Sequence, residues 1–422
     1  MTDRRALAGL LVPLLALGLS GCTDQSPLPV APAAPRSTRR ATPGAPASVA
    51  VDAQASLQRT FTAATAGDRA GWDAGTAAPD PDFAARADVL FANLRVLRPR
   101  RLQVGLTGVE QPPSASRRAT LGPGARVVQA RLDWRLVGER ADASSLVWLT
   151  LVPGPAGERL AGTDDGTALD TPAVPLWWLG PVSVRTRGDV TVLVGPGQDV
   201  DRWSDLAVRA AAGTRNHLPR VLRERWDGRL VVQVPGDEAA LTRLLGAAPS
   251  AYATTAAVTR PEGPTTGAAL RVVVNPAVAG DPDAALGTTL THEAVHVATR
   301  SAVSPAPLWA VEGLAEHVAL RAHPDQRAAE LAALRAGGPA TRLPPDAAFA
   351  AGGEDVTAAY AQAWLVCEAV ADSRGEADLG RLYLALDRGL PLAEAAPATL
   401  DVDDAVVVRW WRDAVRRADA RG

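Results

Sequence analysis

The amino-acid sequence predicts an α+β protein in which an antiparallel sheet with helices precedes a mainly helical domain. The first observation is the length of 422 residues, which exceeds one ordinary compact domain and favours two. The second is a change of apolar period within residues 51–169, from helical spacing at 53–66 and 82–97 to strict alternation. The third is the return of helical spacing in most of the chain after Asp201.

The alternating segments define the expected sheet of the first domain. The clearest strand carries large apolar side chains on one face, at Val128, Ala130, Leu132, Trp134 and Leu136. Residues 102–106 and 146–152 are expected to form other strands of this sheet. Helices followed by a curved antiparallel sheet resemble the nuclear-transport-factor-like (SnoaL-like) cone, so a cone-like fold is expected for 51–169. The unit contains no His and no Cys, and no catalytic role is expected for it.

Five regions are expected along the chain. They are a lipoprotein signal peptide (1–21), a disordered tether (22–50), the cone-like domain (51–169), bridging strands (170–200) and the mainly helical domain (201–422). The bridging runs 182–185 and 190–194 either complete the first sheet or connect the domains. In the last domain we expect strands at 230–234 and 270–274 and helices at 201–225, 238–245, 358–371, 379–388 and 403–417.

The N-terminus has the pattern of a targeting segment. Arg4 and Arg5 precede an apolar run at 6–19 that is too short to span a membrane as a stable helix. The sequence LSGC then ends at Cys22, which resembles a bacterial lipobox. The resemblance implies a diacylglycerol on the Cys22 thiol and an extracytoplasmic, membrane-anchored protein; an ordinary cleaved signal peptide is the alternative. Residues 23–48 are rich in Pro, Ala, Ser and Thr and cannot bury enough surface to fold, so a tether is expected.

Charge and cysteine content narrow the possible partners. The formal net charge is −2, all basic residues are arginine, and no Arg-rich stripe with interleaved aromatic residues is present. Nucleic acid is therefore not expected as a partner. The two cysteines, Cys22 and Cys367, are not expected to pair. Cys367 lies in an apolar helical run and is expected to be a buried free thiol.

The segment 291–296 reads THEAVH and contains the HExxH pattern within an expected helix at 284–300. His292 and His296 are four residues apart, so both imidazoles lie on one helix face and can reach one metal ion. Glu293 cannot coordinate the ion together with both histidines, but its carboxylate can take a proton from a metal-activated water. The pattern therefore predicts a zinc site with Glu293 as general base.

A catalytic zinc site needs a third protein ligand. The metzincin arrangement is excluded, because Ala302 and Thr299 stand where its third His and its Gly would be. Pro305 and Pro307 permit a new helix from about Leu308 that can fold back on the first. This helix carries two candidate carboxylates one turn apart, Glu312 and Glu316.

The segment 309–316 reads WAVEGLAE, and its pattern W-x-x-E-G-x-A-E behind HExxH resembles the gluzincin clan, in particular the bacterial peptidase MA-like group. The resemblance covers residues 291–316 and implies a thermolysin-like helical domain with one Zn²⁺ and Glu312 as third ligand. Glu316 is then expected to orient a histidine through its ring N–H, although it remains a rival ligand. His317 stands where relatives often carry Tyr.

Other residues near the motif are candidates for roles in catalysis or in packing. Tyr360 is the leading candidate for stabilising the oxyanion, with a core tyrosine as the equal alternative. The weaker candidates for that role are His317 and His323. Trp309 is expected to pack the two motif helices together, and Gly313 to let them approach. No role is expected for His217.

The function predicted from these residues is a zinc metallopeptidase acting on a peptide or protein substrate. The lack of an aminopeptidase-type G-x-M-E-N motif favours endopeptidase activity. Two alternatives stay open: a catalytically silent zinc-containing lipoprotein that acts as a binding or scaffold module, and a zinc hydrolase that acts on other envelope amides.

Overall fold

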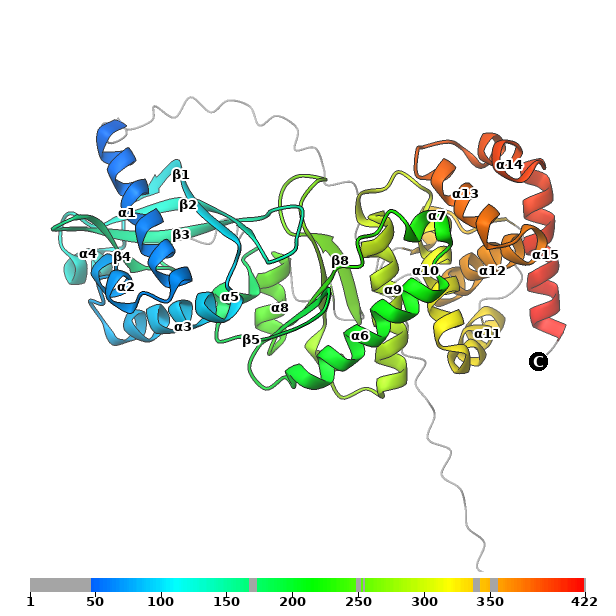
Figure 1. Cartoon of the computed structure of the whole chain (residues 1–422), viewed down its shortest axis with the longest axis horizontal. Helices are drawn as coiled ribbons and strands as arrows, with labels where there is room; N and C mark the ends of the chain where they lie inside the picture. Colours follow the sequence, from blue (N-terminus) through cyan, green and yellow to red (C-terminus); the bar gives the residue numbers. More distant parts are fainter. Residues whose placement is uncertain are drawn as a thin grey trace, which may run out of the picture.

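The computed structural model describes residues 47–166, 173–247, 252, 255–336, 342–349 and 356–420. The signal peptide and Cys22 lie outside these residues. Figure 1 shows three parts along the long axis of the molecule: a first unit, a second sheet with its helices, and a helical C-terminal part. Within the described residues, no helix is long and apolar enough to cross a membrane.

The first unit is a four-stranded antiparallel meander covered by helices, in the strand order β1-β2-β3-β4. Its elements are α1 (Ala47–Ala66), α2 (Arg69–Gly75), α3 (Pro81–Leu97), β1 (Arg101–Gln111), α4 (Ala115–Leu121), β2 (Arg126–Arg135), β3 (Ala143–Gly154) and β4 (Gly157–Gly162). Because α1 begins at Ala47, the last four residues of the predicted tether, 47–50, are helical. The unit is α+β, as predicted.

The alternation predicted for β2 is confirmed. The side chains of Val128, Ala130, Leu132, Trp134 and Leu136 are all buried. They share one core with Leu57 and Phe61 of α1, so the helices cover the apolar face of the sheet. This arrangement follows from the period of two along a strand, which places alternate side chains on one face.

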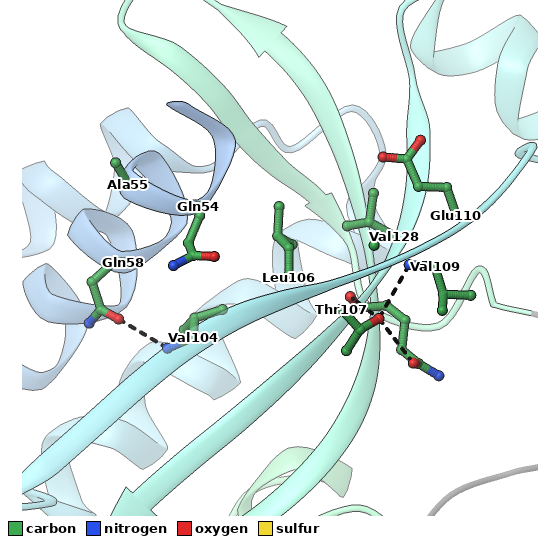
Figure 2. A pocket seen from close by; sticks show the side chains of 11 residues that line it. Gln54, Ala55, Gln58, Val104, Leu106, Thr107, Val109, Glu110 and Val128 are labelled. Atoms are coloured by element: carbon green, nitrogen blue, oxygen red, sulfur yellow. Dashed lines mark hydrogen bonds between the residues drawn. The ribbon is translucent and has the colours of Figure 1, made fainter. Parts of the chain in front are cut away.

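A cavity of about 570 Å³ lies between α1 and the edge strand β1. Figure 2 shows Gln54, Ala55 and Gln58 of α1 facing β1 across it. Gln58 acts as a partner for the edge of the sheet: its amide accepts a hydrogen bond from the Val104 N–H at 3.0 Å and donates one to the Leu102 carbonyl at 3.0 Å. None of the residues of the HExxH and W-x-x-E-G-x-A-E segments lines this cavity.

The second sheet is mixed and has the strand order β5-β6-β7-β9-β8. Its strands are β5 (Ser183–Arg187), β6 (Val190–Val194), β7 (Leu230–Val234), β8 (Ala257–Pro261) and β9 (Leu270–Val274). The three central strands run parallel, and β5 and β8 are antiparallel edges. The two predicted bridging runs therefore belong to this sheet, where β6 pairs with β7, and they do not complete the first one.

The central strands of the second sheet are buried on both faces. Val192, Val232 and Val272 point toward α6 (Val200–His217) and α9 (Asp283–Thr299). Leu193 of β6 and Val231 of β7 are each next in sequence to one of these valines, so their side chains point to the opposite face of the sheet. There they pack into the core of the first unit. Burial on both faces explains why these strands are continuous apolar runs, as is usual for parallel strands.

The remaining elements are mostly helical. They are α5 (Leu176–Leu179), α7 (Arg220–Arg223), α8 (Glu238–Leu245), α10 (Leu308–Ala322), α11 (Arg327–Ala336), α12 (Val356–Arg374), α13 (Glu376–Leu386), α14 (Leu392–Leu400) and α15 (Asp404–Ala420). The single helix predicted for 201–225 is wrong: α6 ends at His217 and α7 is a separate short turn. Leu218 has extended backbone because it precedes Pro219, which disfavours helical geometry in the preceding residue.

A buried ion pair joins the first unit to the second sheet. Arg271 of β9 binds Glu139, from the β2–β3 connection, with two guanidinium nitrogens, and its Nε donates to Glu262 Oε2 at 2.7 Å. All three side chains are buried. Desolvating these charges is expensive, so the arrangement is stable only while each charge keeps its partners.

Arg271→Met is expected to lower the free energy of unfolding by about 3–5 kcal/mol, because it leaves two carboxylates buried without their cation. Urea denaturation measures the loss. Arg220→Ala is the control, because it removes an arginine whose side chain is 80% exposed in its pair with Glu224, and a change of only about 0–1 kcal/mol is expected. Equal losses in both variants would contradict the role given to Arg271.

Candidate metal centre

The HExxH motif lies on α9, a helix that is buried on nearly every side. Its residues from Leu286 to His296 are all buried, and it packs between α6 and α10 and against β8 and β9 (Figure 1). The buried threonines of α9 satisfy their own hydroxyls: Thr288 and Thr291 donate to the carbonyls four residues earlier, at 3.0 and 2.7 Å. The buried part of the helix can therefore carry polar residues.

The turn after α9 brings α10 back along it. Arg300 ends α9 in the left-handed conformation, with φ of 56°. Pro307 then precedes the first residue of α10, and Asp346 accepts a hydrogen bond from the Leu308 N–H at 2.9 Å. The helix predicted from about Leu308 is confirmed, and it carries Glu312 and Glu316 on the side that faces α9.

Three donor atoms from the two helices converge. His292 Nε2 lies 2.9 Å from His296 Nε2 and 3.1 Å from Glu312 Oε2. His296 Nε2 lies 3.3 Å from the same carboxylate oxygen. The three residues form a buried group that could hold a metal ion.

The donor set fits zinc in both chemistry and spacing. Two imidazole nitrogens and one carboxylate oxygen are among the ligands that catalytic zinc uses. In a tetrahedral site with bonds of about 2.0–2.1 Å, donor atoms lie about 3.3 Å apart. The observed separations need only a small expansion to meet that value.

The far side of each imidazole is held by a further polar group. Glu316 Oε1 lies 3.0 Å from His292 Nδ1, and Ser301 Oγ lies 2.7 Å from His296 Nδ1. Contacts of this kind fix the ring and leave Nε2 to face the ion. Glu316 thus lies behind His292, whereas Glu312 lies in front of it, and this geometry favours Glu312 over Glu316 as the third ligand.

Charges within the group act on one another strongly. Burial opposes ionisation of Glu312, but the adjacent imidazoles of His296 and His292 lower its pKa to about 2. Burial likewise opposes a charged His292, but the Glu316 and Glu312 carboxylates raise its pKa well above the ordinary value. The carboxylates therefore favour positive charge at this point, which a proton or a metal cation can provide.

Glu293 is buried beside the two histidines, and its carboxylate is held from a different element. Thr259 of β8 donates a hydrogen bond of 2.6 Å to Glu293 Oε2, and its hydroxyl lies 3.1 Å from the Glu293 carbonyl oxygen. Sequence reasoning missed Thr259, as it missed Ser301, because nothing in the local pattern marks either residue. Strand β8 itself was not predicted.

Three other residues with predicted roles lie on the helices around the two histidines. The ring of Tyr360, on α12, is buried with its centroid 6.1 Å from that of His292. Trp309 shares a core with Val295 and Ala298 of α9. Gly313 was expected to let the two motif helices approach, and this is wrong: a Cβ there would lie 2.3 Å from the Ala363 carbonyl oxygen, so this glycine permits contact between α10 and α12.

The remaining histidines lie in other environments. Thr291 Oγ1 lies 3.0 Å from His323 Nε2, and His217 is partly exposed at the end of α6. Cys367 is a free, buried thiol, as predicted, and burial raises its pKa.

No protein-family model matches the chain, and no curated protein matches it. The interpretation of the centre therefore rests on its own residues.

His317 belongs to a second polar cluster on another face of α10. Its Nδ1 lies 3.1 Å from Glu368 of α12, and its Nε2 lies 3.0 Å from Glu376 of α13. Burial alone would lower the pKa of His317, but the two carboxylates raise it. Burial would raise the pKa of Glu368, but His317 and Arg327 lower it to about 2. The cluster ties three helices together.

These shifts give the cluster a defined pH dependence. The His317 contribution to stability is complete below its ordinary pKa of 6.5 and is lost as pH rises through the raised value. The Glu368 contribution is complete above 4.5 and is lost as pH falls toward 2. His317→Gln should therefore lower the free energy of unfolding by about 1–3 kcal/mol near pH 5.5 and by less near pH 9. Urea denaturation at both pH values tests this, and an equal loss at both would contradict it.

Proposed function

We propose that the chain is a zinc-dependent peptidase of the gluzincin type, anchored outside the cytoplasm by a lipid on Cys22. One observation carries the proposal: two imidazole nitrogens and one carboxylate oxygen converge in a buried group, with a further buried carboxylate, Glu293, next to the first imidazole in sequence. A structural zinc site needs no such additional carboxylate. The cone-like interpretation of the first unit and the lipid anchor remain predictions from the sequence.

The chemistry follows from the residues in place. His292, His296 and Glu312 would hold the ion. Zinc bound there would act as a Lewis acid that polarises the scissile carbonyl and lowers the pKa of a water toward about 7. Glu293 would take the proton of the attacking water and pass it to the leaving nitrogen. Tyr360 remains the proposed donor to the negative charge that develops on the carbonyl oxygen.

The sheet next to the centre supports a peptide as substrate. Strand β8 is an edge of the second sheet, and among the described strands it pairs only with β9. An edge strand can pair with an extended peptide through main-chain hydrogen bonds. Because β8 also carries Thr259, which contacts Glu293, a peptide aligned on this edge would lie near the proposed base.

Glu293→Gln is expected to lower kcat against a peptide library by about 100- to 10,000-fold, because the amide cannot accept the proton of the attacking water. Zinc content should remain about one ion per chain, because Glu293 is not a ligand. Mass spectrometry of digested peptides and elemental analysis measure the two quantities. Glu158→Gln, in the first unit, is the control. A zinc-loaded wild-type protein that cleaves no peptide would instead favour a scaffold role or another amide substrate.

The two carboxylates of α10 should differ in their effect on metal affinity. Glu316→Gln removes the negative charge behind His292 and should weaken zinc binding by about 10- to 100-fold. Glu312→Gln should weaken it by a larger factor, because it replaces a charged ligand with a neutral one. Competition with a chromophoric chelator measures both dissociation constants. The opposite ranking would make Glu316 the third ligand.

A further inference from the structure

Thr259 makes a short hydrogen bond to Glu293 in a buried position. The hydroxyl lies 2.6 Å from Glu293 Oε2, a short distance of the kind expected when the acceptor is a charged carboxylate. Both residues are buried: Thr259 is 4% exposed and Glu293 is 2% exposed. A hydrogen bond to a buried carboxylate restrains the direction of the whole group, because burial limits the access of solvent that could replace the donor.

The hydroxyl of Thr259 is itself held in place. Threonine is branched at Cβ, so few side-chain rotamers are open to it. Thr259 also lies within β8 and is paired with Val272 of β9, in the middle of the register that joins the two strands. The position of the donor therefore depends on the position of the β8–β9 hairpin.

That hairpin is attached to the first unit at the end nearer Glu262. The Ser144 N–H of β3 donates to the Glu262 carbonyl at 2.8 Å, and the Ala269 N–H donates to the Asp142 carbonyl at 3.0 Å. Arg271 adds the buried ion pairs to Glu139 and Glu262. The first unit is thus connected to the β8–β9 hairpin by main-chain and side-chain bonds, one of them at Glu262, three residues after Thr259.

We propose that Thr259 is a positioning residue for the Glu293 carboxylate, and that the first unit holds Thr259 in place through the Glu139–Arg271–Glu262 ion pairs. The first unit would then be part of the apparatus that orients the general base, and not an independent binding module. This inference rests on the proposed function where it concerns catalysis, but the Thr259–Glu293 hydrogen bond can be tested without any reaction.

The first test compares Thr259→Val, which keeps the shape of the side chain, with Thr259→Ser, which keeps the hydroxyl. We expect Thr259→Val to lower kcat by about 10- to 100-fold, because a displaced catalytic group loses rate by that order. KM and zinc content should not change, and Thr259→Ser should retain most of the activity. Thr288→Val is the control, because it removes a buried hydroxyl that bonds only to the main chain. An unchanged kcat in Thr259→Val would overturn the proposal.

The second test is made on the metal-free protein. Thr259→Val should lower the unfolding midpoint by about 2–4 °C in the wild-type background. The shift should be smaller in a Glu293→Ala background, because the main acceptor of the hydroxyl is then gone. Additive shifts would show that the two side chains do not interact and would overturn the proposal. If the shifts are not additive but the protein cleaves no peptide, the hydrogen bond between Thr259 and Glu293 is supported. Only the proposed peptidase activity is then contradicted.

The third test concerns the connection to the first unit. Glu139→Gln should lower kcat by several-fold, and its effect should be smaller when Thr259 is already Val, because both changes act on the same carboxylate. Glu158→Gln is the matched control: Glu158 pairs with Arg126 elsewhere in the same unit and should leave kcat unchanged. A loss of stability in Glu139→Gln at unchanged kcat would overturn this part of the proposal.

Discussion

The contact between α9 and α10 is the interaction on which the rest of the C-terminal part depends. Two imidazoles and two carboxylates lie at the centre of this contact, and each is at most 4% exposed. Burying such groups is unfavourable unless they bind one another or a metal. The helices can therefore pack only in the register that brings Glu312 to the Nε2 side of His292 and Glu316 to its Nδ1 side. The apolar core around them supplies the favourable free energy of burial.

Helix α10 meets a different partner on each of its faces, and this explains both a correct prediction and a wrong one. Glu312 and Glu316 are four residues apart and face α9 together, as helical spacing requires. Gly313 follows Glu312 directly, and its position is rotated by about 100° around the helix axis, since a helix has 3.6 residues per turn. It therefore meets α12 and not α9. His317 is rotated from Glu316 by the same angle and reaches carboxylates on α12 and α13.

The sequence was sufficient where a single element determines the geometry. The HExxH spacing, the apolar runs of β6, β7 and β9, and the alternation of β2 are local patterns, and each predicted the element that is observed. It was insufficient where a partner comes from elsewhere in the chain. Thr259 and Ser301 contact the motif through tertiary packing alone. Strand β8 was missed because its five residues lack a long apolar run and end at Pro261. Proline is tolerated there because β8 is an edge strand.

The buried carboxyl groups around the centre differ in their position and in their pKa. Glu312 is ionised, with a pKa held at about 2, and Glu316 lies against His292. Glu330 of α11 is another buried carboxyl group in this region, and burial, together with the charge of Glu316, raises its pKa to about 8. It is therefore mostly protonated near neutral pH and adds little charge. Glu312 is then the carboxylate that faces the Nε2 atoms of both imidazoles, whereas Glu316 lies on the Nδ1 side of His292. Glu293 is separate from these contacts, because Thr259 holds its carboxylate on the β8 side, and this separation is what the proposed role as general base requires.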